Sequence, residues 1–416
     1  MTSPVRPDGS GPVAEPGAGS AGTFRSLRHR NFRLFFVGQG ISQVGNWLTL
    51  VAQSLLAYHL VGTSLAIGVL SACQFLPVLL LGAYAGVVAD RMDKRRLLLV
   101  VQTLAMVQSF ALAYVAAVGA SVVWLDVVAL FGGLSMAFDN PARRSLFVEL
   151  VDEADVNNAV GLNSSLMTFS RILGPLCAGL LIHSAGYAWC FGADGISYVA
   201  VLVALLMMDP TTMRRSPVVE RARGQVRDGF RYARRTNEIW TPLVMMAVVG
   251  TLAFNFTVVF PRFVSGTFGA QEVVFTWLFS VLSVGSFVGA LIAARRRDVG
   301  VRDVASASIA FGITMTVLSW SPSLFVAFPL ALAVGFASIT FLTTSTAIVQ
   351  LRADPSMRGR VLALQAIVFL GTTPIGGPIV GAVSDHFGPR AGVLLGGVAA
   401  LGAGLWGRWR ATTPVT

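Results

Sequence analysis

Long apolar stretches separated by short polar loops run through this chain of 416 residues. A helix that crosses the hydrocarbon core of a bilayer needs about 20 mostly apolar residues, whereas the strands of a membrane barrel would appear as alternating segments of about ten residues. The apolar stretches have the helical length. They predict twelve spanning helices, within residues 33–58, 65–89, 97–118, 122–142, 160–184, 188–208, 240–261, 272–294, 303–320, 323–349, 359–383 and 391–407.

A repeat runs through these stretches, which one long polar segment divides six and six. A shift of 203 residues aligns Gly82 with Gly285, Gly86 with Gly289, and 174–179 (GPLCAG) with 377–382 (GPIVGA). Two similar six-helix halves are typical of transporters in which substrate binds near the midplane, between halves that rock against each other. We expect an all-α membrane protein whose twelve transmembrane helices form two pseudo-symmetric six-helix bundles.

The polar segments set the expected domain boundaries. Residues 1–22 are rich in Pro, Gly, Ser and Ala and lack the apolar core of a signal peptide, which predicts a disordered tail. The expected parts are this cytoplasmic tail (1–22), an N-terminal bundle (23–208), a cytoplasmic linker (209–238), a C-terminal bundle (239–410) and a short tail (411–416).

The basic residues indicate the orientation. The chain is only 12% charged and carries a net charge of +11, whereas soluble chains are about 25% charged. Nucleic-acid binding would need these charges gathered on one soluble face. Of the 31 Lys and Arg residues, only Arg262 and Arg390 fall on the far side of the predicted spans, and Arg171 lies inside one. The positive-inside rule therefore predicts a multi-pass protein of the cytoplasmic membrane with both termini cytoplasmic.

The sequence lacks the motifs that are typical of other classes of protein. The only lysine, Lys94, follows Asp93, so the chain has no phosphate-binding loop that ends in Gly-Lys-Ser or Gly-Lys-Thr. Cys73, Cys177 and Cys190 have no metal-ligand spacing, and the four histidines lie apart. We expect no enzymatic activity, cofactor or metal. Energy would come from an ion gradient, from the substrate's own gradient or from a separate ATPase subunit.

The loop after the second predicted helix carries an acid among several bases. Asp90 comes first in the charged part of GVVADRMDKRR (86–96), and the sequence around Pro355 predicts the start of helix 11. A helix N-terminus carries about half a positive charge, so Asp90 could close the cytoplasmic side there. A cluster that only sets orientation would explain the bases but not this acid. The expected latch comprises Gly86, Asp90, Arg91, Arg95, Arg96, Arg358 and Arg360.

Polar residues within the predicted spans are candidates for a substrate site. Gln39, Gln43, Asn46 and Gln53 share one face of the first helix. Such a stripe faces a cavity or a partner helix rather than lipid, and both alternatives stay open. Thr251 and Asn255 form a weaker stripe in helix 7. The candidate substrate-binding residues are Gln43, Asn46, Gln53, Thr251 and Asn255.

Arg171 is the one base well inside a span, where an unpaired guanidinium costs at least several kcal/mol. We expect an acidic partner, either Asp139 or Asp194, while Asp126 lies nearer the outer end of helix 4. Such a pair would be structural, or one of its acids would exchange a proton during transport. The proton-coupling candidates are therefore Asp139, Arg171, Asp194 and Asp126.

The chain resembles the major facilitator superfamily. Gly86, Val88, Asp90, Arg91, Arg95 and Arg96 match its loop 2–3 motif, with Asp93 where the family usually has Gly. Residues 138–151 (FDNPARRSLFVELV) and 157–166 (NNAVGLNSSL) are similar to the drug and siderophore exporter branch, which includes enterobactin-exporter-like and macrolide-efflux-like proteins. In helix 5, Gly174, Pro175 and Gly179 are similar to a Gly-Pro motif associated with antiporters.

The resemblance implies a secondary active transporter that works by alternating access. It would export hydrophobic or amphipathic small molecules, such as drugs and siderophore-like metabolites, in exchange for protons. The implied partners are a small-molecule substrate, protons and the lipid bilayer, with no nucleic acid, and we expect a monomer. The alternatives are an uptake transporter or facilitator of a small metabolite and a non-transporting membrane sensor.

Overall fold

The computed structural model describes residues 22–214, 225–293 and 298–412, except the side chains of six residues inside helices, Asp90 among them. Within these ranges the chain is helical, and no β-strand occurs. The first half contains α1 (Arg30–Val61), α2 (Ser64–Arg91), α3 (Lys94–Ala117), α4 (Val122–Glu149), α5 (Val156–Ala185) and α6 (Tyr187–Met207). The second half contains α8 (Asn237–Leu252), α9 (Phe256–Phe268), α10 (Val274–Ala293), α11 (Val301–Ser319), α12 (Leu324–Arg352), α13 (Pro355–Gly371), α14 (Thr373–Phe387) and α15 (Pro389–Arg410).

The prediction of twelve spans is confirmed, although two spans are broken. Among the described residues, ten helices are long and apolar enough to cross a membrane, and one of these runs through α13 and α14. The pair α8 and α9, bent by 42°, adds an eleventh. The twelfth is α1, whose 32 residues have sufficient length and whose polar stripe makes it less apolar than the others. Helices 7 and 11 were predicted to be continuous, but breaks lie before Phe256 and at Thr372.

Short helices fill the loops. These are η1 (Arg25–Arg28), η2 (Glu153–Asp155), η3 (Pro210–Thr212) and α7 (Gln225–Arg235). Both η3 and α7 fall in the polar segment predicted as a linker, and α7 packs against α13. The predicted domain boundaries themselves stay a prediction, and the two tails lie almost wholly outside the described residues.

The two bundles repeat the same helix pairings. In the first bundle α2 packs on α4 and α3 on α6, and in the second α10 packs on α12 and α11 on α15. Glycines bring the backbones together in these pairs, because a Cβ added at Gly285 or Gly335 would collide with a carbonyl oxygen of the partner helix. Gly82, which the repeat aligns with Gly285, meets no such neighbour within 4 Å.

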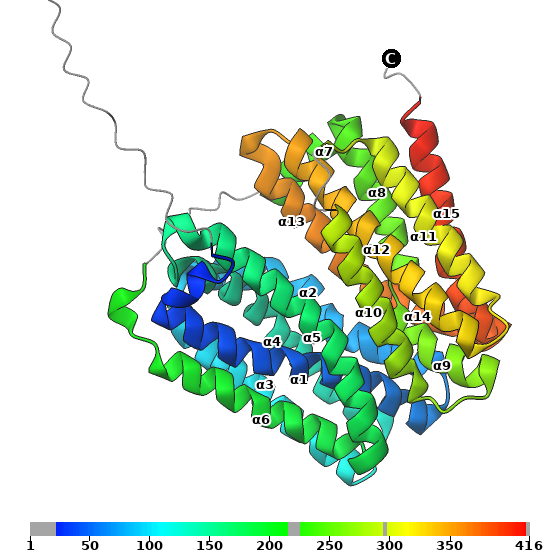
Figure 1. Cartoon of the computed structure of the whole chain (residues 1–416), viewed down its shortest axis with the longest axis horizontal. Helices are drawn as coiled ribbons and strands as arrows, with labels where there is room; N and C mark the ends of the chain where they lie inside the picture. The colour runs from blue at the N-terminus through cyan, green and yellow to red at the C-terminus, as the bar shows by residue number, and fades with distance from the viewer. Residues whose placement is uncertain (1–21, 215–224, 294–297, 413–416) are drawn as a thin grey trace, which may run out of the picture.

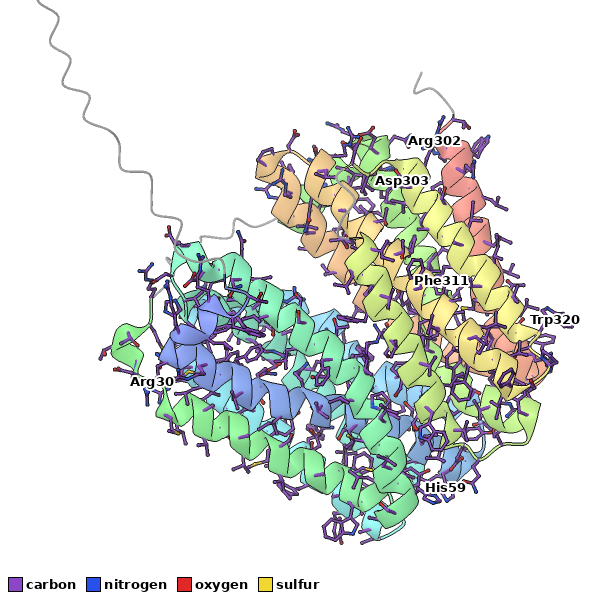
Figure 2. The ribbon with its side chains drawn as sticks, viewed as in Figure 1. Arg30, His59, Arg302, Asp303, Phe311 and Trp320 are labelled. Atoms are coloured by element: carbon purple, nitrogen blue, oxygen red, sulfur yellow. The ribbon has the colours of Figure 1, made fainter. Side chains whose placement is uncertain are left out.

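The bundles meet at one end and diverge at the other (Figure 1). We call the end at which α1 begins and α2 ends the basic end, and the end at which α1 ends and α2 begins the opposite end. Arg30 and Arg302 lie at the diverging basic ends of the two bundles, whereas His59 lies at the opposite end, where the bundles meet (Figure 2). Two helix pairs, α2 with α14 and α5 with α10, make the main contact between the bundles.

The fourth span is longer than predicted. The sequence suggested an end at residue 142, but α4 includes Pro141 and continues to Glu149. Proline is costly inside a helix because it removes one backbone hydrogen bond. The sequence therefore predicts an end near Pro141, one turn or more before the observed end of α4. The extension moves Arg143 from a predicted loop into the helix.

Candidate substrate pocket and the interface between the bundles

A largely buried ion pair lies on α4. The Arg143 guanidinium contacts the Asp139 carboxylate at 2.5 Å, and their side chains are only 13% and 14% exposed. Gln102 of α3 donates to the other carboxylate oxygen of Asp139 at 2.7 Å. An unpaired charge is costly in this environment, and the two opposite charges lie within contact distance of each other. Sequence reasoning placed Arg143 in a loop and missed this role.

The predicted stripe on α1 is tied to this ion pair. Gln43 Oε1 accepts hydrogen bonds from Arg143 (3.0 Å), Asn46 (3.2 Å) and Gln39 (3.1 Å). Asn46 Oδ1 in turn accepts a hydrogen bond from the hydroxyl of Tyr198 on α6 at 2.8 Å. Gln43 and Asn46 therefore join α1 to α4 and α6.

Gln53 lies farther along the same helix and differs from these residues. Its side chain is 1% exposed, and neither of its amide atoms has a hydrogen-bond partner in the structure. A buried amide without partners costs about 1–3 kcal/mol. Unlike Gln43 and Asn46, Gln53 thus makes no side-chain hydrogen bond in the structure.

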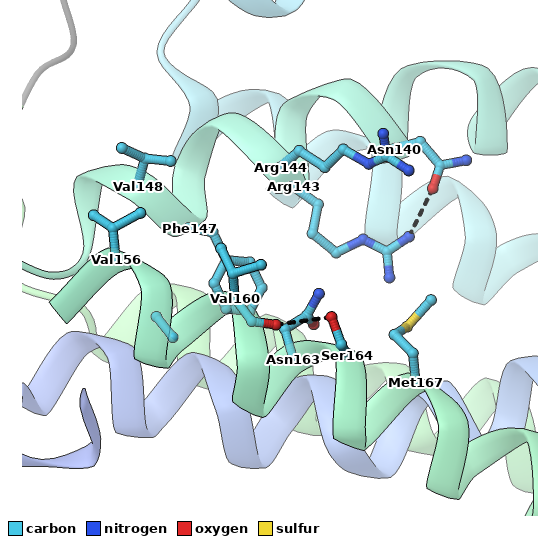
Figure 3. A pocket seen from close by; sticks show the side chains of 11 residues that line it. Asn140, Arg143, Arg144, Phe147, Val148, Val156, Val160, Asn163, Ser164 and Met167 are labelled. Atoms are coloured by element: carbon cyan, nitrogen blue, oxygen red, sulfur yellow. Dashed lines mark hydrogen bonds between the residues drawn. The ribbon is translucent and has the colours of Figure 1, made fainter. Parts of the chain in front are cut away.

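A pocket of about 580 Å³ lies between α4 and α5 near the basic end (Figure 3). Its wall combines apolar side chains with polar and basic ones. The lining residues are Asn140, Arg143, Arg144, Phe147, Val148, Val156, Ala159, Val160, Asn163, Ser164 and Met167. Gln43 lies behind this wall, because Arg143 and Met167 both hydrogen-bond to it.

The matching residues of the second half lie at the break between α8 and α9. Thr251 donates to the carbonyl oxygen of Ala247, and Asn255 donates to that of Thr251, both at 2.6 Å. Gly376 of α14 packs directly against Thr251. Thr251 and Asn255 therefore satisfy local backbone groups and do not line the pocket. The structure does not bring them together with Gln43 and Asn46.

Arg171 has no acidic partner among the described residues, so the expectation of an ion pair with Asp139 or Asp194 is wrong. Its guanidinium carbon lies 5.5 Å from the ring centre of Trp47 on α1 and 5.7 Å from that of Phe279 on α10. These are cation–π distances. Its Nε is buried without a hydrogen bond. Aromatic rings of both bundles thus take the place of a carboxylate.

The acids considered for Arg171 have other surroundings. Asp194 is 1% exposed and accepts hydrogen bonds from the hydroxyls of Thr49 (2.8 Å), Ser109 (2.7 Å) and Ser197 (3.4 Å). These contacts join α6 to α1 and α3. Asp126 has one buried carboxylate oxygen without a partner. Of the three acids, only Asp139 contacts the pocket lining.

The Gly-Pro segment of helix 5 lies between neighbouring helices. A Cβ added at Gly174 would collide with Trp47 of α1, and one added at Gly179 would collide with Thr276 of α10. Pro175 lies inside α5. The repeat-related Gly377 packs against Gly68 of α2. Both copies of the repeat therefore lie where the bundles touch.

The predicted latch region makes contacts within one half of the chain. Arg95 donates to the carbonyl oxygens of Leu205 (2.6 Å) and Leu206 (3.0 Å) at the end of α6. Asp93 caps α3 by accepting from the backbone of Arg96 at 3.0 Å, which gives a role to the acid that stands where the family usually has Gly. Between described residues, no hydrogen bond or ion pair joins the two bundles at the basic end.

The remaining latch residues do not complete a contact between the bundles. Arg360 of α13 lies 3.8 Å from Asp228 of α7, both in the second half. The side chain of Asp90 lies outside the described residues, so the latch that Gly86, Arg91, Arg96 and Arg358 were expected to share with it stays a prediction.

Polar contacts between the bundles gather at the opposite end. Asp385 of α14 contacts the start of α2 and Arg262 of α9. Glu272, just before α10, accepts hydrogen bonds from His59 at 3.0 Å and Tyr187 at 3.1 Å. The Tyr58 hydroxyl hydrogen-bonds to that of Ser265 at 2.8 Å. This end of the molecule is closed by side chains of both bundles.

Comparisons with known proteins agree with this architecture. The staphyloferrin A transporter of Staphylococcus aureus (strain NCTC 8325 / PS 47) is 24% identical over 85% of this chain and 88% of its own length. The multidrug efflux pump Tap of Mycolicibacterium fortuitum is 25% identical over 84% and 88%. Macrolide efflux protein A of Streptococcus pyogenes is 22% identical over 89% and 94%.

Solved structures show the same fold at low sequence identity. A bacterial homologue of the human lysosomal transporter Spinster, in an inward-facing and occupied conformation, matches with a TM-score of 0.69 at 16% identity, over 95% of this chain and 98% of that one. A D-xylose–proton symporter matches with a TM-score of 0.69 at 14% identity, over 92% and 96%.

The match to a protein family covers nearly the whole chain. The model of the family described as "transmembrane secretion effector" matches residues 21–415, and the relatives above are transporters of the drug and siderophore exporter branch. The chain is therefore a multi-pass membrane transporter of the major facilitator superfamily and belongs to its transmembrane secretion effector family.

Proposed function

We propose that this protein exports amphipathic small molecules across the cytoplasmic membrane by alternating access, in exchange for protons. The basic end faces the cytoplasm, and both termini lie there. The concentration of Lys and Arg at that end supports this orientation under the positive-inside rule. The efflux activity named for its relatives supports export.

The proposal of alternating access rests on the distribution of contacts between the bundles. At the outer end, Asp385, Glu272 and Tyr58 take part in hydrogen bonds that cross between the bundles. At the basic end the bundles diverge (Figure 1). This arrangement corresponds to a conformation that is open to the cytoplasm. A rocking motion about the middle of the interface would close the pocket on that side and open the outer end.

The pocket supports a substrate with both apolar and polar parts. Phe147, Val160 and Met167 offer apolar surface, while Asn163 and Arg144 offer hydrogen-bond donors. Its volume of about 580 Å³ lies within the range of ligand sites, roughly 300–1,000 Å³. A substrate there would lie directly beside the ion pair of Arg143 with Asp139.

Asp139 is the acid best placed to couple transport to protons. Protonation of its carboxylate would remove the negative charge that holds Arg143 and free the guanidinium to rotate toward a polar group of the substrate. Release of that proton would restore the ion pair and expel the group. Asp194 is less suited to this exchange, because three hydroxyl groups surround it and only 1% of it is exposed.

Efflux measurements test this function. Cells or proteoliposomes would be loaded with a panel of dyes, macrolides and siderophores, and efflux would be followed under an imposed pH gradient. We expect extrusion of at least one compound, its loss on adding a protonophore, and a loss of roughly tenfold or more in Asp139→Asn, since breaking a buried ion pair costs several kcal/mol. Glu153→Gln, an exposed acid in the loop between α4 and α5, is the matched control. Unaltered gradient-driven efflux in Asp139→Asn would exclude this residue as the proton carrier.

A further inference from the structure

We infer that residues 381–390 form a second copy of the loop 2–3 latch, with Asp385 holding the outer side closed and releasing it when the transporter opens outward. The inference rests on the proposed function and adds to it the group that controls the outer side. The first copy is the stretch 86–96, whose acid, Asp90, is predicted to act at the basic end.

The two sequences agree at the positions that define the motif. GAVSDHFGPR (381–390) has Gly381, Asp385 and Arg390 at the same spacing as Gly86, Asp90 and Arg95 in GVVADRMDKR. It even has Gly388 where the first copy has Asp93. Gly388 has a φ of 101°, a backbone conformation that favours glycine. The second copy therefore keeps the turn glycine that the first copy lacks.

Asp385 binds the start of a helix in the other bundle. Its Oδ1 accepts from the backbone N–H of Ser64 at 2.9 Å and its Oδ2 from that of Leu65 at 2.8 Å. These are the first two residues of α2, where backbone donors lack partners within the helix and carry a partial positive charge. The carboxylate supplies both the acceptors and the opposite charge.

A cation of the second bundle completes this contact. Arg262 of α9 lies 2.8 Å from Asp385 Oδ1 and donates to the carbonyl oxygen of Gly62 at 3.3 Å. The side chains of Arg262 and Asp385 are 24% and 19% exposed. Asp385 therefore lies between α9 of its own bundle and α2 of the other, and Arg262 also reaches across to Gly62.

The helix pair that carries the two acids is antiparallel. α2 runs from the outer end to the basic end, whereas the span formed by α13 and α14 runs the other way. Asp90 lies in the last turn of α2 at the basic end, and Asp385 lies in the last turns of α14 at the outer end. Asp385 thus ends one helix and faces the start of the other, which is the arrangement that the sequence predicts for Asp90 at the basic end with the helices exchanged.

The arginines of the two copies also correspond. Arg95, at the start of α3, donates to carbonyl oxygens at the end of α6. Arg390, at the start of α15, donates to the carbonyl oxygen of Ser321 at 3.1 Å, two residues after the end of α11. Each arginine ties the turn to another helix end of its own bundle. The turn thereby moves with its bundle, while Asp385 and the neighbouring Ser384, whose hydroxyl lies 3.3 Å from that of Ser64, reach across to the other bundle.

The distance between the outer ends of the bundles tests the inference. Spin labels would be placed on Val118→Cys after α3 and Trp320→Cys after α11, both exposed at the outer end, in protein whose three native cysteines are replaced. Double electron–electron resonance would measure their separation in the full-length protein in lipid nanodiscs. We expect Asp385→Asn to move population toward longer distances, and Arg262→Gln to do so more weakly because it leaves the helix cap in place.

A control variant and a measurement of thermal stability separate a latch from a static cap. Asp209→Asn removes a carboxylate that caps Thr211 at 2.9 Å within one half, and we expect it to leave the distances unchanged. The latch proposal is contradicted if Asp385→Asn lowers the melting temperature without altering the distances between the spin labels, and Arg262→Gln alters neither the melting temperature nor these distances. The distances are recorded without substrate or gradient. Altered distances in a protein that extrudes no tested compound would therefore contradict the export proposal alone, whereas extrusion with unaltered distances would contradict the latch alone.

Discussion

At the scale of single residues, one densely charged contact lies outside the membrane spans. Asp155, in the loop between α4 and α5, forms ion pairs with Arg25 and Arg28, and it hydrogen-bonds to His29 at 2.8 Å. Its side chain has no exposed surface. The hydrogen bond from His29 lowers the pKa of Asp155, and the charges of Arg25 and Arg28 act in the same direction against the effect of burial.

This lowered pKa predicts how stability depends on pH. Because the ionised carboxylate is favoured in the folded state, its contribution is present above the ordinary pKa of 3.8 and disappears as the pH falls through the lower folded-state value. We expect Asp155→Asn to lower the melting temperature by several degrees at pH 7, with a difference that shrinks below about pH 4. Thermal unfolding of the purified protein at both pH values measures this. Glu153→Gln in the same loop should show no such dependence, and a difference that stays constant with pH would contradict the role of the charge.

At the scale of helices, glycines set how closely the partners approach. Gly335 of α12 lies against the backbone of Leu282 and Ser286 in α10. We expect Gly335→Ala to destabilise the protein by about 1–3 kcal/mol, since the added methyl group overpacks this contact. Gly192→Ala in α6 is the matched control, because its Cβ would meet no heavy atom within 4 Å, and helix propensity favours alanine there by up to about 1 kcal/mol. Equal thermal stability of the two variants would argue against the close contact of α10 with α12.

The sequence predicts most of the helices, because the apolar length of a span and the repeat of the halves are local features. It predicts the side-chain partners much less well. The partner of Arg143 on α1, Gln43, lies 100 positions away, and Pro141 suggested that α4 had already ended. The rings that surround Arg171 come from α1 and α10. Such neighbours depend on how helices are rotated in the bundle, which hydrophobic periodicity leaves undetermined.

At the scale of the whole molecule, alternating access predicts that the two ends open in opposition. A disulfide between Ser64→Cys and Ser384→Cys should form readily, since the native hydroxyl oxygens, each bonded directly to Cβ like a cysteine sulfur, are 3.3 Å apart at the outer end. A pair at the basic end, Met92→Cys with Arg358→Cys, should form only when that side closes. Each disulfide should stop transport, and a reductant should restore it. We expect a condition that speeds one cross-link to slow the other, as read by mobility of the protein after proteolysis. Acceleration of both together would contradict a rocking motion.

The polar stripe of α1 also bears on how the chain is made. α1 is synthesised before the other described membrane helices, yet the groups outside α1 that bond to its amides belong to α4, α5 and α6. Until those helices are synthesised, Gln43 and Asn46 have only partners within α1 itself, and polar side chains at bilayer depth oppose insertion. We therefore expect α1 to remain beside the translocon until α6 has been synthesised. A nascent chain halted after α3 would then hold its first helix far less firmly in the bilayer than one halted after α6.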